Sequence, residues 1–482
     1  MRSMTRDGPF SHSPLALALG IGLICAGPAL SAEGDPDARL IEEGEYIARA
    51  GGCMSCHGED LAGGYVIDSP MGEIVATNIS PSVEYGIGDY DRADLERVLR
   101  DGVAPDHRLY PAMPFASYRG MRDDDITALY TWLMDQPPVE RPLTQKTDLP
   151  FPFNIRTGMG LWSAVALGET DRILQDDPQI QRGAYLVDHL GHCGECHTPR
   201  NALFAMDQSR YLQGAMIDGW LAPNLTGDPV LGMGAWSTEA IVDYLRDGHS
   251  MNVAQAAGPM GDLVEHATSH LHEDDLTAIA VYLQALPSGR DADEATPTQA
   301  AFLAPEQGRK PTVLYNQIRT ELAEAVQRTD LTPVQAQYLD KCAACHGVDG
   351  NGQPSAYYPP LQDNLALRRP DPTNLVQVLV HGISARTLYR APGMPGFADE
   401  MDNAEIATMA NYLRVTWGGH QDSQITADDV AAILEGQDPP LLVRLAPPLA
   451  WAGIIILLAL IGWIVWLVMR RRNNTPAQEP TP

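Results

Sequence analysis

Three short stretches of this chain hold the residue types that could do chemistry. They read Cys53-Met-Ser-Cys56-His57, Cys193-Gly-Glu-Cys196-His197 and Cys342-Ala-Ala-Cys345-His346. Each stretch places two cysteines and a histidine at positions i, i+3 and i+4, which share one face of a helical turn. Two thiols on that face can form thioethers with the two vinyl groups of one haem, and the histidine can then bind the iron. The motifs therefore predict three covalently attached c-type haems.

Zinc binding and thioredoxin-like redox chemistry are the alternatives for such motifs. A structural zinc ion usually takes four ligands from two paired clusters, whereas each motif here supplies three and lies far from the next in sequence. A redox Cys-x-x-Cys pair needs no histidine directly after it and usually sits in a βαβ context. Three copies with the same following histidine therefore favour haem.

A six-coordinate haem also needs an axial ligand on its other face, usually methionine or histidine. Alignment of the three repeats nominates Met113, Met260 and Met394, each in a loop bounded by proline or glycine. In the second repeat, four neighbours remain rivals of Met260, namely Met251, His249, His266 and His270. Three other methionines fall at or within predicted helices, where methionine usually fills the core; these are Met121, Met401 and Met409.

Two helices must position each motif. The sequence predicts one that begins near Gly44 and runs into the first motif, with counterparts near residues 183 and 336. A second, amphipathic helix closes each repeat, and acidic residues near positions 123, 274 and 402 mark its start. A first and a last helix that cross and enclose a haem describe a cytochrome c domain.

The predicted fold class is therefore all-α. We expect three tandem cytochrome c domains at residues 33–140, 175–290 and 325–420, which agrees with about three domains for 482 residues. The predicted linkers are residues 136–181 and 288–308. A further connection over residues 426–444 leads to the C-terminal segment.

The two ends of the chain read as targeting and membrane segments. Residues 1–32 have the basic start and apolar stretch of a signal peptide, so Cys25 is expected to be removed. Near the other end, residues 449–469 are uncharged and mostly apolar, and as a helix they would span about 30 Å. We therefore expect a transmembrane anchor at residues 447–470. Three arginines follow at once, so the positive-inside rule places the tail in the cytoplasm and the haem domains outside.

Composition excludes several classes of function. The net charge of −29 argues against nucleic-acid binding, which needs basic patches. The sequence has no glycine-rich nucleotide-binding fingerprint, no P-loop and no nucleophile–base constellation. We therefore expect no substrate-oxidising site on this chain.

The motifs resemble those of the cytochrome c subunits of bacterial membrane-bound alcohol, gluconate, sugar and aldehyde dehydrogenases. The resemblance rests on the three Cys-x-x-Cys-His motifs, the run at residues 191–200, the Tyr-Pro-Ala-Met-Pro-Phe run at 110–115 and the Gly-Pro-Met loop at 258–260. It implies a triheme subunit in the inner membrane, with its haem domains in the periplasm.

In that family, electrons come from a separate catalytic subunit that carries a quinone (PQQ), flavin (FAD) or molybdenum cofactor, and they pass to ubiquinone. The resemblance also implies that the six motif cysteines attach haem, that His57, His197 and His346 bind iron, and that the three nominated methionines bind it from the other side. A multihaem peroxidase-like enzyme and a cytochrome c subunit of a terminal oxidase remain as alternatives.

Overall fold

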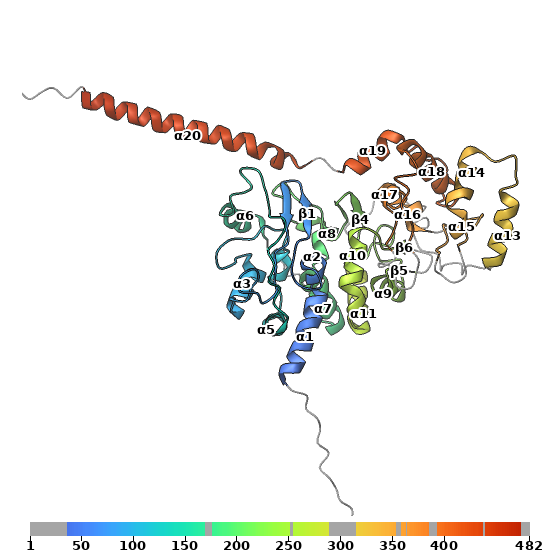
Figure 1. Cartoon of the computed structure of the whole chain (residues 1–482), viewed down its shortest axis with the longest axis horizontal. Coiled ribbons are helices and arrows are strands. Elements are labelled where there is room, and N and C mark those ends of the chain that lie inside the picture. Colours follow the sequence, from blue (N-terminus) through green and yellow to red (C-terminus); the bar gives the residue numbers. More distant parts are fainter. Residues whose placement is uncertain are drawn as a thin grey trace, which may run out of the picture.

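The computed structural model describes residues 36–168, 176–250, 254–288, 315–352, 358–362, 364–384, 393–436 and 439–473. The described chain is predominantly helical, and one long helix, α20 (Leu441–Asn473), projects from a body of packed shorter helices (Figure 1). The predicted signal segment and Cys25 lie outside the described residues. The described residues include the three Cys-x-x-Cys-His motifs, the closing helices and the apolar C-terminal helix.

Short antiparallel strand pairs add to the helices, and the all-α prediction did not include them. They are β1 (Val66–Ser69) with β2 (Gly72–Val75), β3 (Ala215–Ile217) with β4 (Trp220–Ala222), and β5 (His249–Ser250) with β6 (Ala254–Gln255). The pairs β1–β2 and β3–β4 occupy corresponding places in the first two repeats. Each strand has four residues or fewer, too few for a period-two pattern to be recognised in the sequence.

A glycine lies where the first and last helices of each of the first two repeats cross. Helix α1 (Pro36–Ala50) crosses α5 (Asp123–Asp135) at Gly44, and α7 (Pro178–Ala184) crosses α11 (Glu273–Ala285) at Gly183. A Cβ atom added at Gly44 would stand 2.5 Å from the Cβ of Trp132. The prediction that a helix begins near Gly44 is therefore wrong, because α1 starts eight residues earlier and the glycine permits a close crossing.

The third repeat uses α14 (Pro333–Lys341) and α18 (Asn403–Thr416) as its first and last helices. In all three repeats a middle helix ends at a glycine: α3 (Arg92–Asp101), α9 (Thr238–Asp247) and α17 (Thr373–His381). The backbone φ angles of Gly102, Gly248 and Gly382 are +63°, +74° and +75°, a conformation that favours glycine at a helix end. Gly102, Gly248 and Gly382 therefore occupy corresponding places, each directly after the middle helix of its repeat.

The motif helices are α2 (Cys53–His57), α8 (Gly194–His197) and α15 (Ala343–His346). The remaining helices are α4 (Phe115–Tyr118), α6 (Gly158–Ala166), the π-helical η1 (Tyr185–Leu190), the 3₁₀ turns η2 (Gln208–Arg210) and η3 (Thr268–His270), α10 (Pro259–His266), α13 (Tyr315–Ala325), α16 (Leu365–Arg368) and α19 (Ala427–Glu435).

The first two repeats share one hydrophobic core, whereas most of the third repeat forms another. Ile47 and Leu129 of the first repeat are buried in the same cluster as Leu186 and Leu276 of the second. The third repeat buries its own cluster around the fully enclosed Met409. The first two repeats are therefore one packed body.

Two matched polar contacts join these first two repeats. The Tyr185 hydroxyl donates to the carboxylate of Asp125, and the Tyr46 hydroxyl donates to the carboxylate of Asp275. Tyr46 lies in α1 and Tyr185 directly follows α7, while each aspartate lies in the last helix of the other repeat. Arg182 adds a bidentate ion pair to Asp275 at 2.6 and 2.8 Å. The contacts give the pair of repeats an approximate two-fold relation.

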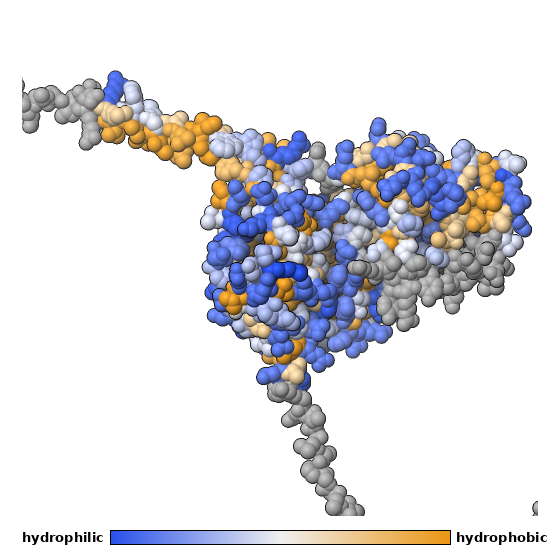
Figure 2. All heavy atoms as spheres, in the orientation of Figure 1, coloured by the Kyte–Doolittle hydropathy of each residue, from blue (hydrophilic) through white to orange (hydrophobic). Residues whose placement is uncertain are grey.

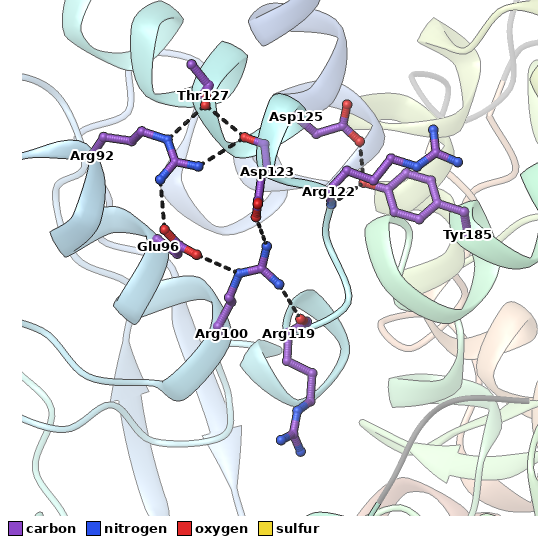
Figure 3. Close-up of polar contacts among 9 residues, drawn as sticks. All are labelled: Arg92, Glu96, Arg100, Arg119, Arg122, Asp123, Asp125, Thr127 and Tyr185. Carbon is purple, nitrogen blue, oxygen red and sulfur yellow. Dashed lines mark hydrogen bonds and ion pairs between the residues drawn. The ribbon is translucent and has the colours of Figure 1, made fainter.

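Figure 3 shows the Tyr185–Asp125 contact beside an ion-pair network within the first repeat. Arg100 lies at its centre, with its guanidinium 3.1 Å from Glu96 and 2.5 Å from Asp123. The same guanidinium donates to the backbone carbonyl of Arg119 at 2.9 Å. The network ties α3 to the start of α5, the helix that presents Asp125 to the second repeat.

The third repeat docks onto the second through side-chain amides. The Asn374 amide accepts from the backbone N–H of Leu221 at 2.8 Å and donates to the Leu221 carbonyl at 2.9 Å. Gln377 donates to the carbonyl of Gly219 at 2.8 Å. These amides satisfy the otherwise open edge of β4, so α17 lies against the β3–β4 pair.

Two segments predicted as linkers pack onto neighbouring repeats. Residues 139–166 lie on the first repeat, where the Thr147 hydroxyl accepts from the N–H of Val75 at 3.0 Å and Asn78 donates to the Val139 carbonyl at 2.9 Å. Helix α19 buries Val430 completely in the core of the third repeat. Packing therefore continues beyond the predicted ends at residues 140 and 420, because short apolar stretches between polar residues gave no readable period.

Helix α20 is longer than the predicted anchor. It begins at Leu441 and includes Pro447 and Pro448, which the sequence analysis placed at its boundary. Both prolines lie inside the helix, where each removes one backbone hydrogen bond, and in the structure the helix continues through them. Residues 443–470 are apolar enough and long enough to cross a membrane. Most of their side chains are exposed, and Figure 2 shows this helix as a mainly hydrophobic rod.

Candidate functional site: three Cys-x-x-Cys-His turns around one cavity

Each motif lies on a short helical turn, as the spacing predicted. The turns α2, α8 and α15 bring the two cysteines and the histidine of each motif to the wall of one cavity, which runs through all three repeats. Its lining includes Cys53, Cys56, His57, Cys193, Cys196, His197, Cys342, Cys345 and His346. All six cysteines are free thiols, so none is used in a disulfide.

The three histidines share one hydrogen-bonding arrangement. The Nδ1 atom of His57 lies 2.7 Å from the carbonyl oxygen of Thr77, and that of His197 lies 2.7 Å from the carbonyl of Pro223. His346 Nδ1 lies 2.9 Å from a carbonyl as well, that of Pro359. A carbonyl oxygen can only accept, so Nδ1 must carry the proton in each ring. The lone pair is then on Nε2, the arrangement that fixes a histidine ligand toward a metal.

Burial keeps these groups uncharged. It lowers the pKa of all three histidines, to about 4 for His197, so the imidazoles are neutral at pH 7. Burial also raises the thiol pKa values, to about 12 for Cys53, Cys193 and Cys342. A zinc site or a reactive redox pair needs thiolates, whereas thioethers carry no charge. The cavity therefore fits cysteines bound to haem vinyl groups better than thiolate chemistry.

The distribution of ligand types also fits haem. Among the described residues, no three His, Cys, Asp or Glu side chains form a metal-binding cluster, which a zinc site would require. Instead, each repeat contributes to the cavity one histidine and one of the nominated methionines, Met113, Met260 or Met394. One nitrogen and one thioether per repeat are the axial donors that a six-coordinate haem uses.

The structure separates Met260 from three of its rivals. Met260 lines the cavity, while His249, His266 and His270 are absent from its described lining. His266 points to Glu59 at 3.3 Å, and His270 lies 3.1 Å from the backbone carbonyl of Glu265. The fourth rival, Met251, lies outside the described residues.

The first two motifs lie next to each other. His192, which directly precedes the second motif, has its Nε2 atom 3.3 Å from the backbone carbonyl of Gly51, just ahead of the first motif. The Tyr118 hydroxyl donates to the same carbonyl at 2.5 Å, and its ring meets His192 edge-on with centroids 5.5 Å apart. The residues directly before the first and the second motif are therefore in contact with each other.

The sequence analysis missed two features of the cavity. Thr77 and Pro223 lie in the similar runs Ala-Thr-Asn-Ile at 76–79 and Ala-Pro-Asn-Leu at 222–225. That similarity was the available signal, but a backbone acceptor has no residue signature. Arg369 of the third repeat also lines the cavity. It lies close enough to His197 and Tyr244 of the second repeat for its positive charge to act to lower the pKa of each, and burial lowers its own pKa. Contacts between repeats leave no trace in sequence spacing.

Comparison with known proteins identifies the family of this chain. The cytochrome c family model matches residues 332–417. The chain is 36% identical over 455 residues to the fructose dehydrogenase cytochrome subunit of Gluconobacter japonicus, covering 90% of this chain and 92% of the relative. It is also 36% identical to the gluconate 2-dehydrogenase cytochrome c subunit of Pantoea cypripedii, covering 87% of this chain and 94% of the relative.

A third relative is the cytochrome c subunit of alcohol dehydrogenase (quinone) from Gluconobacter oxydans, at 34% identity over 89% of this chain and 90% of the relative. The similarity to each of the three therefore extends over nearly the whole length of both proteins. This confirms the resemblance that the motifs indicated and implies covalently bound haem c. The chain belongs to the family of cytochrome c subunits of fructose, gluconate and alcohol dehydrogenases.

Proposed function

We propose that this chain is a triheme electron-transfer subunit, which receives electrons from a separate catalytic dehydrogenase subunit and delivers them to membrane ubiquinone. The continuous cavity carries the proposal, because it joins three Cys-x-x-Cys-His turns that share one histidine arrangement. Haem c, when bound there, supplies one-electron redox chemistry. The names of the relatives support the catalytic partner, and one of them includes the word quinone.

The residues of the chain would divide the work as follows. Six cysteines would hold three haems. His57, His197 and His346 would each offer Nε2 to an iron, because carbonyls fix their Nδ1 atoms, and Met113, Met260 and Met394 would each supply a thioether as the second donor. A thioether ligand raises the haem potential relative to a second histidine, which suits accepting electrons from an organic substrate's oxidation.

Membrane attachment follows from α20. We place its apolar residues 443–470 across the inner membrane. Arg470 ends this stretch and Arg471 and Arg472 follow it, so the positive-inside rule supports a cytoplasmic tail and three periplasmic repeats. Residues 1–32 would direct export and be removed.

Mass spectrometry of the intact mature protein tests the haem count. We expect a mass equal to the processed polypeptide plus three haem groups, and a loss of one haem when Cys193 and Cys196 are both changed to serine. A mass increase of fewer than three haems in the unchanged protein would contradict the proposal.

A methionine substitution tests the axial ligands. Met113→Ala should lower one midpoint potential and slow reduction of a soluble ubiquinone analogue, with all three haems retained. Met121→Leu is the matched control, since Met121 is buried in the core and is not part of the described cavity lining. Three unchanged potentials in the Met113 variant would remove Met113 from the ligand set.

A peroxidase-like enzyme would need at least one iron with an open or displaceable site. The presence of a methionine in the cavity wall of every repeat counts against that function. A high-spin ferric signal from the purified protein would favour it instead.

A further inference from the structure

The segment between the first two repeats, residues 149–168, exposes large apolar side chains to solvent. On α6, Leu161 and Val165 are 72% and 65% exposed, and their i, i+4 spacing puts them on one helix face. Ile155, in the preceding turn, is 47% exposed. We call these three side chains the α6 face. An exposed apolar cluster of this kind marks an interaction surface when the backbone beneath it is fixed.

The backbone beneath the α6 face is fixed by specific contacts. The indole N–H of Trp162 donates to the carbonyl of Leu203 at 2.7 Å, which ties α6 to the second repeat. Arg156 donates to the carbonyl of Arg108 at 2.9 Å, and its guanidinium lies 4.5 Å from the centre of the Tyr110 ring. The apolar side chains are thus presented by a packed element.

The charge of this segment departs from that of the rest of the chain. The protein contains 62 acidic residues and has a net charge of −29. Residues 149–168 contain no Asp or Glu, and Arg156 is their one charged residue. A surface that approached anionic lipid headgroups would need this local absence of negative charge.

The segment also lies beside the membrane helix. The ring of Phe151 meets that of Trp451 with centroids 5.1 Å apart, and Trp451 belongs to the apolar stretch of α20 near its N-terminal end. Figure 1 shows α6 on the flank of the body next to this end of α20. Tryptophan favours the level of the lipid headgroups, so the α6 face lies close to that level.

We propose that the α6 face is a second membrane contact, which rests in the headgroup region of the outer leaflet beside α20. The occupant is the lipid surface itself, because a bilayer crossed by α20 is already adjacent to Trp451 and Phe151. Burial of Leu161 and Val165 at that boundary is favourable in the way that interfacial helices bind. The proposal rests on the proposed function in one respect, that α20 spans the membrane.

One consequence concerns the orientation of the cavity. Arg156 and Tyr110, which lie beneath the α6 face, both line the first repeat's part of the cavity. Contact between this face and the bilayer would therefore hold the first repeat closest to the lipid. It would also stop the body from swinging freely about the connection before α20.

Spin labelling of the full-length haem-loaded protein in phosphatidylcholine–phosphatidylglycerol vesicles tests this contact. A nitroxide is attached to Val165→Cys, and its collision rates with oxygen, which enters lipid, and with a water-soluble nickel chelate are compared. Asp124→Cys, an exposed site at the start of α5, is the aqueous control. Ile461→Cys, within α20, is the lipid control.

We expect the label at position 165 to collide with the nickel chelate several-fold less often than the label at 124, and to collide with oxygen more often. A label at 165 that matches the one at 124 would overturn the contact. Low collision rates with both reagents would also overturn it, because a protein partner would then cover the face. Nickel access to the label at 461 would instead refute the membrane span, and with it the anchor in the proposed function.

Discussion

Substitution of Gly44 by alanine should loosen the crossing of α1 and α5, two helices that form part of the cavity wall in the first repeat. The added Cβ atom would lie 2.5 Å from the Cβ of Trp132 and 2.8 Å from the carbonyl carbon of Ala128. The second of these atoms belongs to the backbone, so no side-chain rotation can relieve the clash and the two helices must separate.

The size of the effect follows from two opposing terms. Overpacking a close contact costs about 1–3 kcal/mol, while replacing glycine with alanine inside a helix gains about 1 kcal/mol. Because backbone atoms of Ala128 are part of the clash, the cost lies in the upper part of that range, about 2–3 kcal/mol. The expected net loss in local stability is then about 1–2 kcal/mol, which is a factor of about 5–30 in the opening equilibrium.

Hydrogen exchange monitored by mass spectrometry measures this opening. Peptides from α1 and α5 of Gly44→Ala should exchange faster by that factor, and peptides from α14 and α18 of the third repeat should not change. Gly158→Ala is the matched control, because no atom lies within 4 Å of the Cβ position there. Unchanged exchange in α1 and α5 would refute the view that this glycine exists to permit the crossing.

Three further substitutions probe the contacts between repeats. Tyr185→Phe should destabilise the interface between the first two repeats by about 1.5–3 kcal/mol, because it removes a hydrogen bond to the carboxylate of Asp125. Tyr130→Phe removes a hydrogen bond to the neutral backbone carbonyl of Tyr90, so it should lower the stability less in the same hydrogen-exchange assay. Burial opposes ionisation of Asp275, but hydrogen bonds from its arginine and tyrosine partners outweigh it and hold the pKa below its usual value. Its contribution to stability is therefore present above about pH 4 and is lost as the pH falls through the lowered pKa, so Asp275→Asn should flatten the acid limb of a stability–pH curve. Arg369→Gln removes a cation from the cavity wall and should lower one midpoint potential in a redox titration, while Arg369→Lys should restore most of it; equal potentials in all three proteins would count against a role for that charge.

Much of the local structure was predictable because it depends on neighbours in sequence. The i, i+3, i+4 spacing of Cys53, Cys56 and His57 fixes a helical turn wherever the chain folds, and the structure has that turn. Acidic residues before an apolar stripe likewise predicted the starts of α5, α11 and α18 within about a residue. The relatives confirm the family that these motifs indicated.

What escaped prediction depends on residues distant in sequence. In the sequence, a glycine such as Gly44 suggests the start of a helix. Only its neighbours across the crossing, Ala128 and Trp132, show why a side chain is excluded there. Arg369 has no aligned counterpart among the cavity residues of the first two repeats, so its place near His197 follows from the docking of the third repeat. The iron-binding roles of Met113, Met260 and Met394 remain predictions.

The single core that Leu129 and Leu276 share has a practical consequence for anyone who trims this gene. A protein truncated after residue 168 would expose the apolar surface that the second repeat normally covers, and it would tend to aggregate. The smallest fragment expected to fold is residues 36–288, in which each of the two repeats buries apolar side chains of the other.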